Sequence, residues 1–218
     1  MKENRDDTKY SVAILCGGNS TRMGQDKAEM QAGGMRMVDR LLAAFSGYGE
    51  ILLSVRDGKQ RDLLTEARQK KAAQNMVCVT DPIRNAGPLA GIVASLRACR
   101  EEWLFVTAVD MPYMDREFAE DLFAYRDKLS AQDLPEAGTD AIVPVGMDGH
   151  VQPMSAFYSK KALPVLEECL QSRTYSLWRC FQKLQVTRVP VSLIPESGRK
   201  LVNLNRPEDL EACMKAGD

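Results

Sequence analysis

The sequence predicts an α/β fold in which a mainly parallel sheet lies between two layers of helices. Short runs rich in valine, isoleucine and leucine alternate with longer segments of helical period, and Gly, Asp or Pro closes each run. This alternation is typical of parallel sheets with right-handed crossovers. A length of 218 residues, with 44% hydrophobic and 27% charged residues, suits a globular chain with one substantial core. We therefore expect one domain over residues 1–218.

Five apolar runs are predicted to be buried strands because they are short and rich in aliphatic side chains. They are residues 11–15, 50–55, 76–80, 103–109 and 141–145.

Helices are predicted between these runs. Over residues 36–48, one face carries four apolar side chains, which are Met37, Leu41, Leu42 and Phe45. Residues 88–100 begin with Pro88, which a first helical turn tolerates, and residues 115–129 begin with Asp115, a good helix cap.

The chain changes character after residue 145. Residues 147–159 are predicted to form a turn and an antiparallel strand, two short helices follow, and residues 186–192 are expected to add an edge strand.

Charge and cysteine usage exclude several classes of function. The formal net charge of -1, from 29 basic and 30 acidic residues, argues against a surface for nucleic acid or anionic lipid. No segment reaches the roughly 18 apolar residues of a spanning helix, and the polar N-terminus does not look like an export signal. We expect a cytoplasmic protein with no membrane partner. The cysteines lack a Cys-x-x-Cys pair and are predicted to be buried thiols. They are Cys16, Cys78, Cys99, Cys169, Cys180 and Cys213.

A glycine-rich segment after the first predicted strand has the features of a polyphosphate site. Gly17 and Gly18 allow backbone N–H groups to approach a ligand, and Arg22 and Lys27 add positive charge. The spacing fits neither G-x-x-x-x-G-K-[ST] nor G-x-G-x-x-G, so neither the usual P-loop nor a dinucleotide turn is favoured. The structural alternative is a glycine turn with two solvated cations.

The string LCGGNSTRMGQDKAEM, residues 15–30, resembles the signature L-A-G-G-x-S-x-R-M-G-x-D-K of the molybdenum cofactor guanylyltransferases. Four further blocks resemble the family in its own order: VTDPIRNAGPLAGI, VTAVDMPYM, DGHVQPMSAFYS and VNLNRPEDL. The resemblance covers nearly the whole chain. It implies a nucleotidyltransferase domain of the nucleotide-diphospho-sugar transferase-like, Rossmann-like fold.

The resemblance also implies roles for single residues. Arg22, Lys27 and Asp110 would act on the phosphates, with Asp110 as the ligand of Mg²⁺. The implied nucleotide-binding residues are Leu15, Cys16, Gly17, Gly18, Lys27, Ser54, Asp81, Gly87 and Asp110. The implied acceptor-binding residues are His150, Pro153, Asn203 and Asn205.

Two of these positions depart from the family pattern. Cys16 stands where alanine is usual, and Ser54 stands in place of a common asparagine, which weakens one expected nucleotide contact. For Asp110 the residue chemistry agrees with the resemblance, because a carboxylate that ends an apolar strand lies at the edge where Mg²⁺ and phosphates meet. The alternative role, a helix cap, is better filled by Asp115. His150 is equally well explained as a solvated loop residue.

The implied reaction joins the terminal phosphate of molybdopterin, or of its molybdenum-loaded form, to the α-phosphorus of GTP and releases pyrophosphate. Partners in that case are GTP and molybdopterin, together with cofactor-recipient enzymes or chaperones. A transferase of another base or acceptor, such as a molybdopterin cytidylyltransferase or a sugar-phosphate nucleotidyltransferase, is the alternative. Cytidine-using relatives typically have Ala-Gly where this chain has Gly17 and Gly18, which favours guanine. A binding protein that kept the fold and lost activity is a third class.

Overall fold

The computed structural model describes residues 10–17, 26–32, 34–66, 75–128, 138–204 and 209. Within these ranges a seven-stranded sheet runs in the order β5-β4-β1-β6-β8-β7-β9. Its strands are β1 (Ser11–Leu15), β4 (Ile51–Val55), β5 (Met76–Thr80), β6 (Trp103–Ala108), β7 (Ala141–Val145), β8 (Ser155–Ser159) and β9 (Val186–Pro190). A separate two-stranded sheet pairs β2 (Gln31–Ala32) with β3 (Met35–Arg36).

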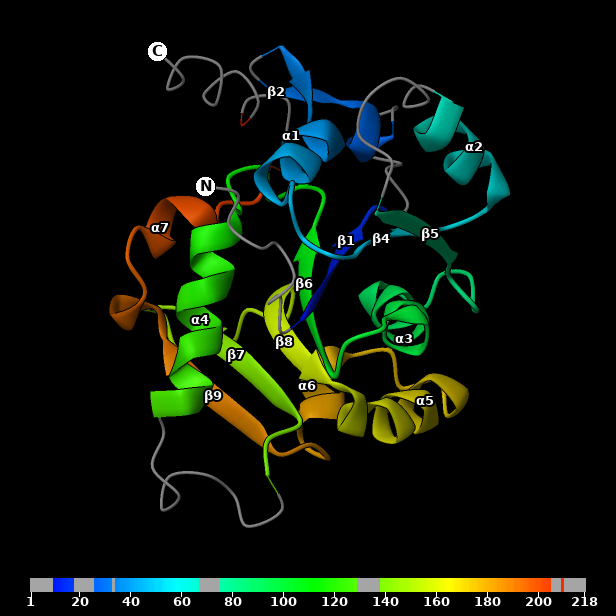
Figure 1. The fold of residues 1–218 in the computed structure, drawn as a ribbon. Helices are drawn as coiled ribbons and strands as arrows, with labels where there is room; N and C mark the ends of the chain where they lie inside the picture. Colours follow the sequence, from blue (N-terminus) through cyan, green and yellow to red (C-terminus); the bar gives the residue numbers. More distant parts are fainter. Residues whose placement is uncertain are drawn as a thin grey trace.

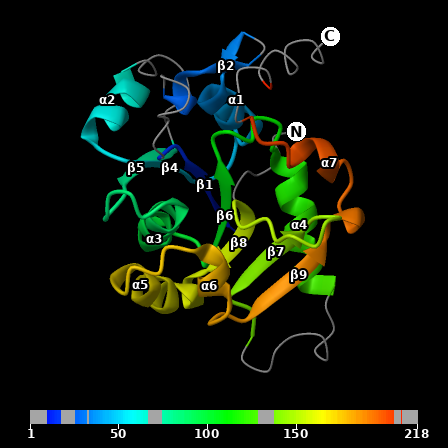
Figure 2. The same ribbon diagram turned by 180° about the vertical axis from the view of Figure 1, so that it is seen from behind.

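Helices cover both faces of the large sheet (Figures 1 and 2). The α-helices are α1 (Met37–Ala44), α2 (Gly58–Glu66), α3 (Pro88–Ala98), α4 (Arg116–Lys128), α5 (Leu163–Gln171), α6 (Leu177–Phe181) and α7 (Ser197–Lys200). Short 3-10 helices are η1 (Lys27–Glu29), η2 (Lys160–Ala162) and η3 (Val191–Leu193). The predicted three-layer α/β architecture is confirmed.

Strand direction divides the sheet into a parallel part and a mixed part. β5, β4, β1 and β6 are parallel neighbours, and Leu15 of β1 pairs with Ser54 of β4 and Ala108 of β6. β8 is antiparallel to both β6 and β7, as expected, and β9 adds a parallel edge strand beside β7. The last residues of the parallel strands therefore stand level with one another, at the edge where such sheets bind ligands.

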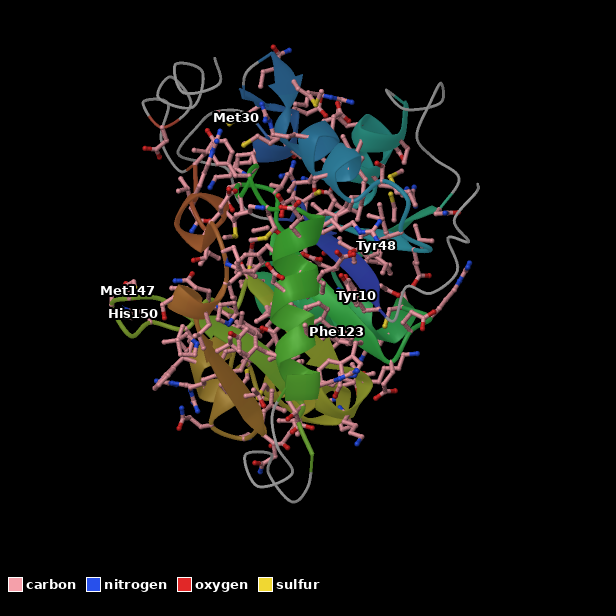
Figure 3. All side chains as sticks on the ribbon, turned by 60° about the vertical axis from the view of Figure 1, so that its left-hand side comes forward. Tyr10, Met30, Tyr48, Phe123, Met147 and His150 are labelled. Carbon is pink, nitrogen blue, oxygen red and sulfur yellow. The ribbon has the colours of Figure 1, made fainter. Side chains whose placement is uncertain are left out.

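The two faces of the sheet bury separate apolar clusters. On one face α1 and α4 pack on the sheet, and the four predicted side chains of α1 and its C-terminus, from Met37 to Phe45, are all buried. The rings of Tyr10, Phe123 and Phe157 pack there at tilted and edge-on angles, with ring centroids 4.7–5.0 Å apart (Figure 3 labels the first two). On the opposite face α3, α5 and α6 cover the strands. Alternate residues of the strands therefore point into the two clusters, as expected for a sheet covered on both faces.

The structure corrects some predicted boundaries and burial. Helix α1 ends at Ala44, before the predicted end, and Gly47 shortly after it has a φ of 97°. Helix α4 begins directly after Asp115, as predicted, and Asp115 Oδ1 accepts from Phe118 N at 3.1 Å. The expectation of buried thiols holds for four of the five described cysteines, while Cys78 is half-buried because β5 is an edge strand. Cys213 lies outside the described residues. No helix in the described part of the chain is long and apolar enough to span a bilayer.

Candidate active site

A cavity of about 650 Å³ opens at the carboxyl edge of the parallel strands. Leu15 and Gly17 line it from the end of β1, and the segment after β5 contributes Asp81 and Gly87. Met154 closes it from the segment before β8. The volume is in the range of small-molecule and cofactor sites.

Gly17 and Asp81 approach each other so closely that no side chain fits between them. A Cβ atom on Gly17 would lie 2.8 Å from Asp81 Oδ2, well inside van der Waals contact. The backbone of Asp81 is held in place, because its N donates to Val55 O at 2.9 Å. The absence of a side chain at position 17 therefore leaves room for the Asp81 carboxylate as well as for a ligand.

The Asp81 carboxylate is prepared as an acceptor. Ser54 Oγ donates to its Oδ1 at 2.7 Å. Burial raises the pKa of Asp81, and the hydrogen bond from Ser54 opposes that rise. Ser54 thus orients Asp81 from the neighbouring strand. The comparison with the usual asparagine predicts only a weaker nucleotide contact at position 54.

The second charged pair joins Lys27 to Asp110. Lys27 is the first residue of η1, and its Nζ lies 2.8 Å from Asp110 Oδ2. The two side chains are 23% and 19% exposed, so the pair is reached by solvent but is not on the open surface. Leu204 N donates to Asp110 O at 2.8 Å, which brings the segment that contains Asn203 alongside.

The loop from Asp81 to Gly87 leads into the N-terminus of α3 at the cavity wall. Gly87 has a φ of 64°, which non-glycine residues rarely adopt, and Pro88 occupies the first turn of the helix. Both residues line the cavity. The free N–H groups of a helix N-terminus favour an anion at this point.

Two arginines that the sequence interpretation did not single out also line the cavity. Arg56 directly follows β4, and Arg84 lies in the loop after β5. The rule that parallel strands present their carboxyl ends at one edge could have found Arg56, because it stands immediately after a predicted strand. Arg84 carries no comparable signal, since its placement depends on the path of the loop.

The expected acceptor-binding residues lie on segments that follow the same edge. His150 is exposed in the turn after β7, and its Nδ1 is 3.2 Å from Asp148 Oδ2 (Figure 3). Pro153 O accepts from Tyr158 OH at 2.8 Å, one residue before the cavity-lining Met154. Asn203 is exposed. The expected residues Gly18, Arg22 and Asn205 lie outside the described residues.

Among the described residues, no group of three or more His, Cys, Asp and Glu side chains could hold a metal ion. A protein-only metal cage is therefore absent from that part of the chain. Asp110 is instead a single hard oxygen donor just beyond the end of β6. Mg²⁺ is commonly held by one or two carboxylates together with substrate phosphates. The position of Lys27 Nζ shows that this carboxylate already attracts a cation.

Comparison with known proteins gives a consistent result. Residues 12–188 match the family model of the MobA-like NTP transferase domain. A Methanosarcina mazei protein named "Probable molybdenum cofactor guanylyltransferase" is 36% identical over 207 residues, covering 92% of this chain and 88% of the relative. A Pseudomonas putida protein named "Molybdenum cofactor guanylyltransferase" is 31% identical over 206 residues, covering 92% and 95%. The crystal structure of molybdopterin-guanine dinucleotide biosynthesis protein A from Archaeoglobus fulgidus is 26% identical, has a TM-score of 0.77, and covers 94% of this chain and 97% of its own.

Proposed function

The chain belongs to the MobA-like NTP transferase family, and from this premise we propose that it is a molybdenum cofactor guanylyltransferase, one nucleotidyltransferase domain that transfers GMP from GTP to molybdopterin or the molybdenum cofactor. One observation carries the proposal. Two separate pairs, Gly17 with Asp81 and Lys27 with Asp110, lie at one edge of the sheet, and the first pair lines a cavity of about 650 Å³. The first pair suits a nucleoside and the second suits its phosphates.

In the proposed binding mode, the nucleoside lies against Leu15, Cys16 and Gly17, with Asp81 accepting from guanine N–H groups or ribose hydroxyls. A carboxylate can accept two such hydrogen bonds, and Ser54 keeps it oriented. Gly87 and the N-terminus of α3 border the same cavity. Gly18 is proposed to complete the contact with the nucleotide.

The phosphates are proposed to lie toward Lys27 and Asp110. Asp110 would hold Mg²⁺, which supplies positive charge to the α-phosphate and to the departing pyrophosphate. Lys27 contributes a further cation from within the chain, and we propose the same role for Arg22. Their combined charge favours a transition state in which negative charge develops on the phosphate oxygens.

The reaction needs no nucleophile from the protein. An oxygen of the acceptor's terminal phosphate attacks the α-phosphorus of GTP, the bond from that phosphorus to the bridging oxygen breaks, and pyrophosphate leaves with the electron pair. The chain's task is to align the attacking and leaving oxygens and to neutralise their charge. We propose that His150, Pro153, Asn203 and Asn205 receive the acceptor.

We also propose a cytoplasmic location and transfer of the product to cofactor-recipient enzymes or chaperones. The location is supported by the five described cysteines, all of which are free thiols.

The proposal is tested by pyrophosphate release from GTP, CTP and ATP with purified molybdopterin as acceptor. We expect a much larger kcat/KM for GTP, because buried groups matched to guanine are left unpaired by the other bases, and such mismatches can cost several orders of magnitude in the strongest cases. Comparable rates with CTP and GTP would contradict the guanylyltransferase and favour a transferase of another base. Turnover with a sugar phosphate but not with molybdopterin would show that the acceptor is a sugar phosphate.

A further inference from the structure

Gln60, a buried side chain on α2, uses both ends of its amide to connect three segments of the candidate site. Its Nε2 donates to Cys16 O at 2.9 Å and to Asp26 Oδ2 at 2.8 Å. Its Oε1 accepts from Arg56 N at 2.9 Å. The residue is 1% exposed, so these bonds are made away from water. One amide therefore joins the end of β1, the residue before Lys27 and the end of β4.

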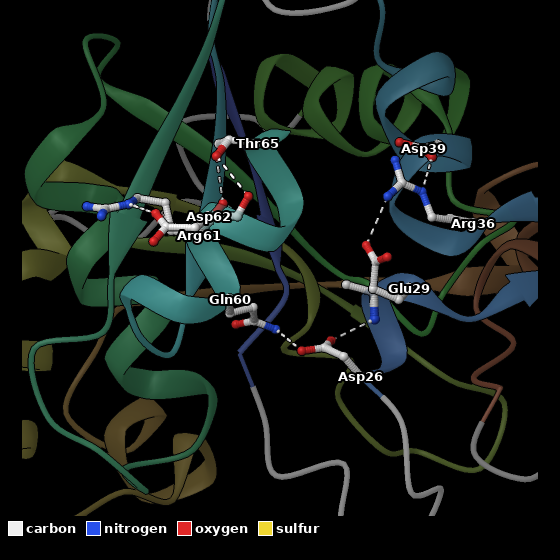
Figure 4. Close-up of polar contacts among 9 residues, drawn as sticks. Asp26, Glu29, Arg36, Asp39, Gln60, Arg61, Asp62 and Thr65 are labelled. Atoms are coloured by element: carbon white, nitrogen blue, oxygen red, sulfur yellow. Dashed lines mark hydrogen bonds and ion pairs between the residues drawn. The ribbon is translucent and has the colours of Figure 1, made fainter. Parts of the chain in front are cut away.

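Asp26 passes this constraint on to Lys27. Its Oδ1 accepts from Ala28 N at 3.0 Å and so caps η1, the short helix that begins at Lys27. Its Oδ2 receives both Gln60 Nε2 and Arg56 Nη2, the latter at 2.9 Å. Figure 4 shows Gln60 and Asp26 facing each other, with the cap bond on the other side of the carboxylate. The orientation of η1 is thus set by hydrogen bonds that begin at Gln60.

Resting on the proposed function, we infer that Gln60 is a positioning residue of the guanylyl transfer: through Asp26 it holds Lys27 at the phosphates and opposite Asp110. The ion pair of 2.8 Å between Lys27 and Asp110 is the end of this chain of contacts. Gln60 itself touches neither reacting group. Its effect on rate comes from the aim of the Lys27 ammonium, since small displacements of a charge-neutralising group lower the rate steeply.

A purely structural role for Gln60 is also visible, and it uses a different atom. Asp57 Oδ1 accepts from Gln60 N at 2.9 Å while Gln60 Oε1 accepts from Arg56 N, an arrangement close to a reciprocal capping box at the start of α2. Helix capping therefore needs only the Oε1 acceptor. Positioning of Asp26 needs the Nε2 donor.

The two roles are separated by Gln60→Glu and Gln60→Met. Gln60→Glu keeps an acceptor for Arg56 N but replaces the donor with a carboxylate that faces Asp26, whereas Gln60→Met removes both functions. We expect Gln60→Glu to lower kcat by about 10- to 100-fold at pH 8, with a smaller change in KM for GTP, because a misplacement of about 1 Å has effects of this size. Ser11→Ala is the matched control, since it removes a buried 2.7 Å bond to Glu50 at the other end of β1 and should leave kcat unchanged.

Two readouts distinguish positioning from general destabilisation. In a Lys27→Met background, Gln60→Glu should change the residual rate by less than about twofold, because residues that act through one another are not additive. Between pH 8 and 5.5 the ratio of the Gln60→Glu rate to the wild-type rate should rise, because the introduced carboxyl group, buried and facing Asp26, can take up a proton and regain a donor, while Arg56 stays paired with Asp26. Gln60→Met should show no such recovery.

Hydrogen exchange at the Ala28 amide tests the same contact without any ligand. Gln60→Glu should accelerate that exchange, because Asp26 is no longer held in its capping position. The inference is overturned if Gln60→Glu shows both the Ala28 exchange and the transfer rate of the wild type. It is also overturned if Gln60→Glu lowers the rate by the same factor in the wild type and in the Lys27→Met background. If the wild-type protein transfers no guanylyl group, the proposed function fails, and Ala28 exchange still decides whether Gln60 orders η1.

Discussion

Lys27 Nζ lies 2.8 Å from Asp110 Oδ2, so the lysine from the glycine-rich region is paired with the carboxylate proposed to hold Mg²⁺. The two residues are 83 positions apart in the chain. If Asp110 holds Mg²⁺ as proposed, the Lys27 ammonium and the metal ion would compete for the same carboxylate oxygen, and the pair would connect metal binding to nucleotide binding. Phosphates would then offer Lys27 new acceptors and release Asp110 for the metal.

Replacement of Lys27 should therefore have opposite effects on metal binding and on turnover. We expect Lys27→Met to lower the rate of guanylyl transfer by about 100- to 1,000-fold, the usual effect of losing one charge-stabilising group. It should also raise the affinity for Mn²⁺, a spectroscopic substitute for Mg²⁺, by at least about fivefold without nucleotide, since even two charges 4 Å apart in water interact by about 1 kcal/mol. An electron paramagnetic resonance titration measures the change. Lys183→Met, which breaks an exposed 2.7 Å ion pair with Glu168, should leave Mn²⁺ affinity unchanged. Weaker Mn²⁺ binding in Lys27→Met would contradict the competition.

Removal of the Asp110 carboxylate should separate catalysis from folding. We expect Asp110→Ala to abolish Mg²⁺-supported turnover while lowering the free energy of unfolding by less than about 1 kcal/mol, because partly exposed ion pairs contribute little to stability. Turnover across a Mg²⁺ titration and a urea melt measure the two effects. Turnover that stays at the wild-type level would exclude Asp110 as the metal ligand.

A methyl group at position 17 should act on the nucleotide through Asp81. In Gly17→Ala the new Cβ would stand 2.8 Å from Asp81 Oδ2, so the carboxylate must move. We expect GTP affinity, measured by calorimetry, to fall by about tenfold or more, with a loss of stability of about 1–3 kcal/mol from overpacking. Mn²⁺ affinity at Asp110 should not change. Gly198→Ala is the control, because nothing lies within 4 Å of its new Cβ, and unchanged GTP affinity in Gly17→Ala would refute the crowding.

The raised pKa of Asp81 predicts a pH dependence of stability. Burial raises the folded-state pKa, so the folded protein binds the proton more tightly than the unfolded chain, whose value is about 3.9. Between the unfolded-state pKa and the folded-state pKa, the stability contributed by Asp81 falls as pH rises. Above the folded-state pKa, the carboxylate is charged in both states and the full free-energy cost of burying it remains. Asp81→Asn does not titrate. Its unfolding free energy relative to wild type should therefore increase from about pH 3 to neutrality, while GTP binding is lost, and urea melts at several pH values measure the trend. A stability difference that stays constant or decreases over this pH range would contradict it.

Local features of the sequence determined the elements of this fold. The five apolar runs became strands, and α1 buried its predicted face from Met37 to Phe45, because strand and helix periodicity are carried by neighbouring residues. The cap at Asp115 and the φ of 64° at Gly87 likewise follow from single residue types beside a helix. The position of Asp81 and Asp110 at one edge follows from strand order alone, since each stands at the end of a parallel strand.

Contacts across the chain were decided only by the tertiary structure. Nothing local indicates that Asp81 fills the space beside Gly17, or that Gln60 joins Cys16 to Asp26, because these residues are brought together by crossovers and loop paths. The insertion of β8 between β6 and β7 is of the same kind. The residue pattern specifies which face of an element is buried. The pairs Ser54–Asp81 and Lys27–Asp110, which are 27 and 83 positions apart in the chain, instead depend on how the whole core packs. That packing places the Lys27 ammonium against Asp110.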